Sequence, residues 1–346
     1  MERPETFVHG NANEDRKKEE TEHIKKAYEK GYSSEHLSRE DEEKLLEAEE
    51  LKTPTDIEAV DLANTITNDL LVQYDLTPFD LKENNVHVIG EDLYKKFYRS
   101  LKNADACYQA IHQAVFIEHS KRRPAEERVG KILHETIHFK GFQSDQVFEF
   151  QNKDRKNSKD KIVHTAPFRE GLKVPPNLKQ MRENSVPFYV KFKGLNEAVV
   201  VELEKKLLPI LISRARIIPK ELYFDFSRKV EVASAENIDP SEIEFVYKED
   251  QGRSYFGYQK QRDTLNFVVD SILQDNPSLD REKVMEKFFR AYFSGHILEI
   301  ARLVENSFGK GSFRILSNMD VDHESSETVK MVLTERREDR VQPLGA

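Results

Sequence analysis

The segment of residues 124–139 constrains the fold more than any other part of the chain. It begins Pro124-Ala-Glu-Glu, and both proline and acidic residues favour the first turn of a helix. Apolar side chains recur along it at helical spacing, at positions 129, 132, 133 and 137. His134, Glu135 and His138 lie between them. We therefore predict a core helix over 124–139 that keeps one polar face.

This polar face has the pattern of a metal site. Residues four apart lie on the same side of a helix, so His134 and His138 can direct both imidazoles at one point. A catalytic zinc ion usually takes three protein ligands, with bonds to imidazole nitrogen of about 2.0–2.1 Å. Glu135 can then serve as general base for a water that the metal activates. We expect Zn²⁺ as the cofactor; the alternative is a surface helix with two exposed histidines.

One candidate for the third ligand continues the motif as His-Glu-x-x-His-x-x-Gly-x-x-His/Asp, the metzincin pattern. Gly141 fits this pattern. The ligand position, however, is Ser144, and Asp145 comes one residue late. Serine is a poor zinc ligand, so this candidate fails.

A second candidate lies in residues 194–198, which read Gly-Leu-Asn-Glu-Ala and lead into a predicted helix over 196–212. This resembles the gluzincins, the thermolysin-like zinc peptidases, in a minimal bacterial form. The resemblance implies that Glu197 is the third ligand, 197 − 138 = 59 residues after His138. Gluzincins often carry an acid four residues later that orients a zinc-bound histidine. Here that position is Val201, with Glu202 one residue further on, so the orienting residue stays open; the alternative for Glu197 is an ordinary acid near a helix N-terminus.

A gluzincin site also needs a donor for the oxyanion of the tetrahedral intermediate. We select Tyr258, at the start of a predicted helix, and then Tyr255; the alternative is that both are packing aromatics. His164 and His296 are further candidates. Arg169 is a candidate substrate contact, although a lone arginine is more often a surface charge.

The resemblance implies an α+β, zincin-like fold, with a small mixed sheet packed on the metal-binding helix and a mostly helical C-terminal part. Substrates of such folds lie extended along an edge strand. We expect that strand at Val115–Glu118. Further strands are expected at 86–89, 161–165 and 187–192, and further helices at 91–100, 258–274, 280–293 and 296–307.

Composition divides the chain into four segments. Residues 1–55 are rich in Glu, Lys and Asp and bury too little to fold alone, which predicts a charged flexible tail. The catalytic domain follows at 56–225, a helical C-terminal subdomain at 226–316, and a polar tail at 317–346.

Charge and hydropathy exclude several partners. With 54 basic and 63 acidic residues the net charge is −9, which argues against nucleic acid or an anionic membrane as the main partner. No apolar run approaches the roughly 20 residues that cross a bilayer, and the N-terminus has no signal-peptide pattern. Cys107 is the single cysteine, so no internal disulfide forms. We expect a cytoplasmic protein; the oligomeric state stays open.

The leading hypothesis is a zinc metallopeptidase acting on a peptide or protein substrate. A zinc hydrolase of another amide or ester uses the same chemistry at the metal, so the sequence does not separate the two. A third possibility is a catalytically inactive zincin-like scaffold that acts as a protein-binding or regulatory module. Nucleic-acid binding by the lysines of 153–161 is a weaker option, because acids are interleaved with them.

Overall fold

The computed structural model describes residues 7–31, 43–44, 47, 49–97, 105–110, 112–119, 127–151, 161–175, 190–218, 226–246 and 253–341. It is an α+β structure, mostly helical, with small sheets. The chain forms two compact units. The first contains His23–Lys140 and Leu203–Gly257, and the second contains Glu5–Glu22, Gly141–Glu202 and Tyr258–Ala346. These units are described one at a time.

The first unit is built on a four-stranded mixed sheet with the order β2-β3-β5-β4. Its strands are β2 (Glu49–Glu50), β3 (Val86–Gly90), β5 (Ala114–His119) and β4 (Ala106–Gln109). β3 and β5 are parallel, and the two outer strands run antiparallel to their neighbours. The short helix α4 (Glu91–Phe97) follows β3. The predicted strands at 86–89 and 115–117 are confirmed.

The prediction that Val115–Glu118 forms an edge strand is wrong. These residues belong to β5, which pairs with β3 on one side and β4 on the other. Val115, Phe116 and Ile117 are fully buried. A continuous apolar run is the pattern of a strand covered on both faces, which places it inside a sheet rather than at its edge. In the described sheet the edge beside β5 is β4.

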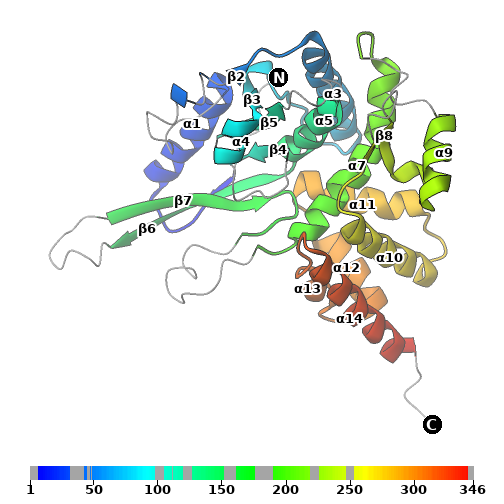
Figure 1. The fold of residues 1–346 in the computed structure, drawn as a ribbon. Helices are drawn as coiled ribbons and strands as arrows, with labels where there is room; N and C mark the ends of the chain where they lie inside the picture. Colours follow the sequence, from blue (N-terminus) through cyan, green and yellow to red (C-terminus); the bar gives the residue numbers. More distant parts are fainter. Residues whose placement is uncertain are drawn as a thin grey trace. The chain divides into compact units, whose positions relative to one another are not determined.

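Helices α5 (Glu127–Lys140) and α3 (Pro54–Gln73) pack together in the same unit, and α5 also contacts β4 and β5 (Figure 1). The helix predicted over 124–139 is confirmed from Glu127 on, and its predicted first residues, 124–126, lie outside the described residues. α3 begins with a capping box in which Thr53 and Asp56 bond each other's backbone. Asp56 also receives two hydrogen bonds from Arg128 of α5, Nε–Oδ1 at 2.8 Å and Nη2–Oδ2 at 2.8 Å. This buried pair fixes α5 against α3.

Part of the segment expected to be a solvated tail is packed. Helix α1 (Glu14–Lys30) buries Ile24, Ala27 and Tyr28. The Tyr28 hydroxyl donates to the Asp80 carbonyl at 2.8 Å. These three side chains have helical spacing within a strongly charged stretch. The overall composition of the segment does not show this spacing, because charged residues outnumber the apolar ones. The four-segment division of the chain stays a prediction.

The first unit is completed by a helix and a hairpin. Helix α9 (Phe226–Glu236) packs against β8 (Ile243–Val246), which pairs with β9 (Arg253–Tyr255). Ala233, Ile243 and Val246 form a small apolar cluster that holds the hairpin on the helix. Short 3₁₀ turns precede β3 and β8, at Glu83–Asn85 and Pro240–Glu242.

Helix α7 (Lys193–Arg214) continues without a break from the second unit into the first. It confirms the helix predicted at 196–212. Between Leu195 and Ile212 its aliphatic residues are buried except Ile210, which is 37% exposed, and this burial explains why the helix forms despite Pro209 in its interior. The residues of α7 therefore have the relative positions of one continuous helix.

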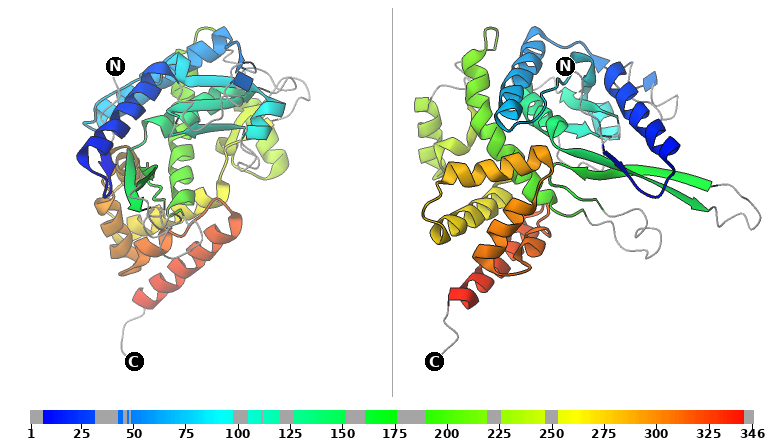
Figure 2. Two further views of the ribbon diagram at one scale, coloured as in Figure 1. Left: turned by 90° about the vertical axis from the view of Figure 1, so that its left-hand side faces the viewer. Right: turned by 180° about the vertical axis from the view of Figure 1, so that it is seen from behind.

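The second unit joins a three-stranded sheet to a set of helices. In the sheet, β1 (Phe7–His9) runs parallel to β6 (Gln143–Gln151), which forms an antiparallel hairpin with β7 (Lys161–Glu170). Figure 2 shows β6 and β7 as a long two-stranded ribbon. The helices are α10 (Gln259–Asp275), α11 (Arg281–Ser294), α12 (Leu298–Phe308), α13 (Ser312–Leu316) and α14 (His323–Val341).

These elements confirm the strand predicted at 161–165 and the three predicted C-terminal helices. The segment expected to be a polar tail contains α14, with Val329 and Leu333 buried. The strand expected at 187–192 falls largely outside the described residues. Among the helices that are described, none combines the length and hydropathy needed to span a bilayer.

Candidate metal centre

His134, His138 and Glu197, the three predicted ligands, come together in the structure. One ligand atom from each residue lies within 4.8 Å of the corresponding atoms of the other two. The Nε2 atoms of the two histidines are 3.2 Å apart. Both histidines are half-buried, and Glu197 is 7% exposed. The arrangement is a group of two imidazoles and one carboxylate that can hold a metal ion.

The spacing of the two histidine nitrogens suits zinc. Two nitrogens on a tetrahedral zinc ion, each with a bond of about 2.05 Å, are separated by about 3.3 Å. The 3.2 Å between the two Nε2 atoms matches this separation. Two imidazoles and a carboxylate are also the ligand set of a catalytic zinc site that keeps a fourth position for water or substrate.

A carboxylate on α7 orients His134. The Nδ1–H of His134 donates to Oε2 of Glu204 at 2.9 Å, and Glu204 is 5% exposed. Because Nδ1 carries the proton in this contact, Nε2 presents its lone pair towards His138 and Glu197. Glu204 thus selects the tautomer that a metal ligand needs.

Glu204 is the acid that orients His134, the residue that the sequence alone did not identify. It stands seven residues after Glu197, and seven residues are close to two helical turns, so both acids lie on one face of α7. Val201 is instead part of the core, at 1% exposure. Glu202 points to Arg262, with 3.5 Å between Oε1 and Nη1. The spacing of seven was the signal in the sequence that could have identified Glu204.

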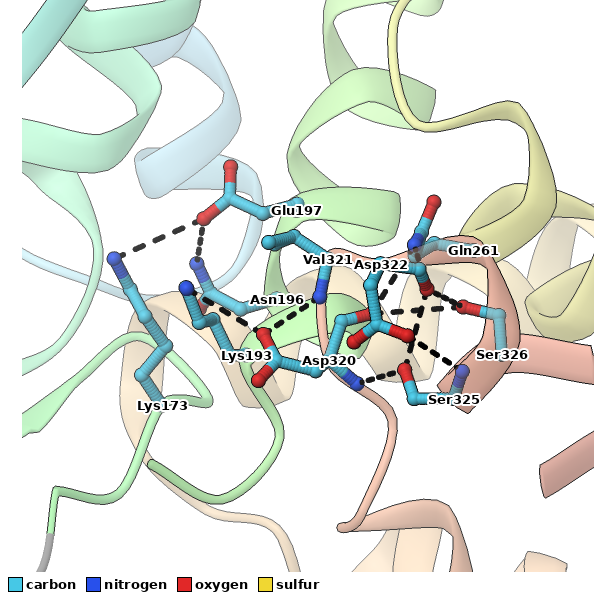
Figure 3. Close-up of polar contacts among 10 residues, drawn as sticks. All are labelled: Lys173, Lys193, Asn196, Glu197, Gln261, Asp320, Val321, Asp322, Ser325 and Ser326. Carbon is cyan, nitrogen blue, oxygen red and sulfur yellow. Dashed lines mark hydrogen bonds and ion pairs between the residues drawn. The ribbon is translucent and has the colours of Figure 1, made fainter. Parts of the chain in front are cut away.

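Glu197 has two polar neighbours in the second unit (Figure 3). Lys173 Nζ lies 3.8 Å from its Oε1, and Asn196 Nδ2 lies 3.5 Å from the same atom. Asn196 also accepts the Leu172 N–H through Oδ1 at 2.9 Å. The asparagine of the Asn-Glu-Ala sequence therefore fixes the start of α7 to the turn at 171–172.

Glu135, the predicted general base, lies at the edge of the sheet. Its Oε2 accepts the backbone N–H of Tyr108 in β4 at 2.6 Å, and the residue is 5% exposed. Glu135 follows His134 directly on α5, so the base is next to a predicted ligand and held by the edge strand at the same time.

The predicted role of Tyr255 and Tyr258 as oxyanion donors is not tested. The Tyr255 hydroxyl donates to Glu236 and also contacts Arg253. Tyr258 precedes α10 with a φ of 54° and is 36% exposed. His296 is exposed.

Arg169 is engaged inside the second unit. Its Nη1 donates to the Gly295 carbonyl at 2.6 Å and its Nε to the Gly171 carbonyl at 3.2 Å. The guanidinium also lies 5.3 Å from the centre of the Phe142 ring. Burial lowers the pKa of Arg169 to about 10. These contacts give the arginine a structural role in joining β7 to the turn after α11.

Comparison of the chain with protein-family models, with curated proteins and with solved structures finds no match. The case for the site therefore depends on the geometry of its own residues.

Proposed function

We propose that this chain is a zinc-dependent hydrolase of the gluzincin type that cleaves peptide bonds in a peptide or protein substrate. The observation that supports the proposal is the convergence of ligand atoms from His134, His138 and Glu197. Zinc bound there supplies Lewis acidity and lowers the pKa of water towards about 7.

The roles of the protein side chains follow from their positions. His134 and His138 present Nε2, and Glu197 presents a carboxylate oxygen, as ligands. Glu135 accepts the proton of the attacking water and returns it to the leaving amine, which is general base and then general acid catalysis. The Tyr108 N–H fixes the Glu135 carboxylate for this task. Tyr258, with Tyr255 as second choice, is proposed as the oxyanion donor.

The edge strand favours a peptide over another amide or ester. β4 pairs with β5 along one side only in the described sheet. An extended peptide can add to such an edge by backbone hydrogen bonds. The contact between Tyr108 and Glu135 belongs to the same strand, so a peptide on β4 would lie beside the base.

The first experiment measures metal content by mass spectrometry after zinc is offered. We expect about one zinc per chain in the wild type, and its loss in His134→Ala and in Glu197→Gln. His323→Ala, at an exposed position at the start of α14, is the matched control and should retain zinc. A wild type that binds no zinc overturns the proposal.

The second experiment follows cleavage of a mixed peptide library. Glu135→Gln should keep its zinc and lose turnover by at least about 100-fold, because it keeps the shape of the side chain but cannot take a proton. Glu127→Gln, in the first turn of the same helix, should cleave normally. A zinc-loaded wild type that cleaves no peptide would instead support the scaffold hypothesis.

A further inference from the structure

The start of α7 is held by residues 317–322, the segment between α13 and α14. The backbone N–H of Phe192 donates to the Ser317 carbonyl at 2.7 Å. The N–H of Gly194 donates to the Met319 carbonyl at 2.8 Å. The first N–H groups of a helix have no partner within the helix and are usually capped by a side chain. Here backbone carbonyls of the 317–322 segment do part of this capping.

The segment and the helix start also fit closely together. A Cβ atom on Gly194 would lie 2.3 Å from the Asp320 carbonyl oxygen, so any side chain there would collide with the backbone. Phe192 has a φ of 60°, in the left-handed region that bulky residues rarely adopt. Its ring packs against Phe313 of α13, with 4.9 Å between the ring centres. The chain therefore enters α7 in a strained conformation that these contacts maintain.

Gln261 of α10 fixes the segment in turn (Figure 3). Its Nε2 donates to the Asp320 carbonyl at 3.1 Å and to the Asp322 carbonyl at 3.0 Å. Gln261 is 1% exposed, and its Oε1 has no hydrogen-bond partner among the described residues. Leaving a buried acceptor unpaired is unfavourable, so the two bonds that the amide does make are what this side chain contributes. Both bonds go to the segment that caps α7.

The position of this helix start decides where Glu197 lies. Glu197 follows Gly194 by three residues, less than one turn along the same helix. On the other side of this turn, Asn196 Oδ1 accepts the Leu172 N–H at 2.9 Å. A binding constellation needs its groups within about 0.5 Å of the productive geometry. A shift of the first turn of α7 would move the Glu197 carboxylate with it.

We propose that Gln261 is a positioning residue of the metal centre, which directs Glu197 through the 317–322 segment and Gly194. The inference rests on the metal centre of the proposed function and adds Gln261 and Gly194 to it. Their contribution is the position of the first turn of α7, and hence the place of the Glu197 carboxylate.

The first test is the zinc dissociation constant, measured by competition with a chromophoric chelator. Gln261→Met keeps the length of the side chain and removes both donors, and we expect it to weaken zinc binding about 10–100-fold. Gly194→Ala, which forces the Asp320 carbonyl away, should give a loss in the same range. Thr264→Val is the matched control, since Thr264 is a buried residue of the same helix whose hydroxyl donates to the Ser326 carbonyl at 3.3 Å. Wild-type affinity in Gln261→Met would refute the inference.

The visible spectrum of Co²⁺, bound in place of zinc, tests whether the loss acts through Glu197. The bands depend on the ligands of the metal and on their geometry. At saturating Co²⁺, Gln261→Met should change the bands in the same direction as Glu197→Gln does, and Thr264→Val should keep the wild-type spectrum. An unchanged spectrum in Gln261→Met would mean that Glu197 keeps its place, which overturns the inference even if the variant loses thermal stability.

Hydrogen exchange in the metal-free protein, followed residue by residue by NMR, separates this inference from the proposed function. The Gly194 amide hydrogen should be protected in the wild type and in Thr264→Val, because it is bonded to the Met319 carbonyl. In Gln261→Met it should exchange at least about tenfold faster. Equal protection in all three proteins overturns the inference, whether or not zinc binds. A wild type that binds no zinc overturns the proposed function, and the exchange result still decides whether Gln261 fixes the start of α7.

Discussion

The ion pair between Arg128 and Asp56 should carry a large share of the stability of the first unit. We consider Arg128→Leu, which keeps an apolar side chain in place but leaves Asp56 without its partner. The Arg128 side chain is 6% exposed and the Asp56 side chain 0%. Removing one member of a buried pair typically costs about 3–5 kcal/mol, because the remaining charge stays buried without compensation. Asp56 keeps its hydrogen bonds from Thr53, at 2.7 Å from N and 2.8 Å from Oγ1, which places the expected cost at the lower end, about 3 kcal/mol.

The assay is urea unfolding of metal-free protein at pH 7, followed by circular dichroism. Arg214→Leu is the matched control, since Arg214 bonds Asp69 at 3.1 Å with side chains 45% and 64% exposed. Exposed pairs contribute about 0–1 kcal/mol, so this variant should unfold almost as the wild type does. A loss below about 1 kcal/mol in Arg128→Leu would refute the argument.

The pH dependence gives a second check on the same pair. Burial alone would raise the pKa of Asp56, but the hydrogen bonds from Arg128 and Thr53 outweigh it and lower the pKa. A lowered pKa stabilises the folded state above the unfolded value of about 3.9, and this contribution disappears as the pH falls through the folded value. The deficit of Arg128→Leu should therefore shrink as the pH falls below about 3.9, and its charge-dependent part should be gone below the lowered pKa of Asp56 in the folded wild type.

Two further predictions concern buried groups outside the metal centre. Burial lowers the pKa of Lys140 to about 7, and its Nζ donates to Asn68 Oδ1 at 2.6 Å. The unfolded lysine titrates near 10.4, so the unfolded state binds more protons between these values and the free energy of unfolding should rise from pH ~7 to ~10.4. Lys140→Met should flatten this rise in urea titrations; an unchanged slope contradicts the assignment. Burial raises the pKa of Cys107 to about 12, so its thiol should react with an aromatic disulfide reagent only after unfolding, and rapid reaction of the native protein would contradict the burial.

The local pattern of the sequence predicts the helices and most strands well. Helix α5 could be predicted because its apolar residues have helical spacing. Helix α7 could be predicted because a long, mainly apolar segment follows the Asn-Glu-Ala motif. The sequence did not show whether β5 is a central or an edge strand of its sheet. Both a central and an edge strand can read as a short apolar run, and only the pairing with β3 and β4 decides between them.

The candidate site was predicted where its residues are close in sequence and missed where they are not. His134, Glu135 and His138 lie within five residues, and Glu197 was found through a local motif. Glu204 follows His134 by 204 − 134 = 70 residues and stands outside the Asn-Glu-Ala motif. Its contact with Nδ1 of His134 is a property of the tertiary structure.

The two acids on α7 also limit how this part of the gene can change in length. One residue inserted between Glu197 and Glu204 would rotate one relative to the other by about 100° around the helix, and one of them would leave the candidate metal centre. Insertion or deletion of a whole turn would keep both on one face but shift one by about 5 Å along the axis. The segment between the two acids should therefore keep its length in homologous chains. Their insertions and deletions should lie in the connections between helices and strands.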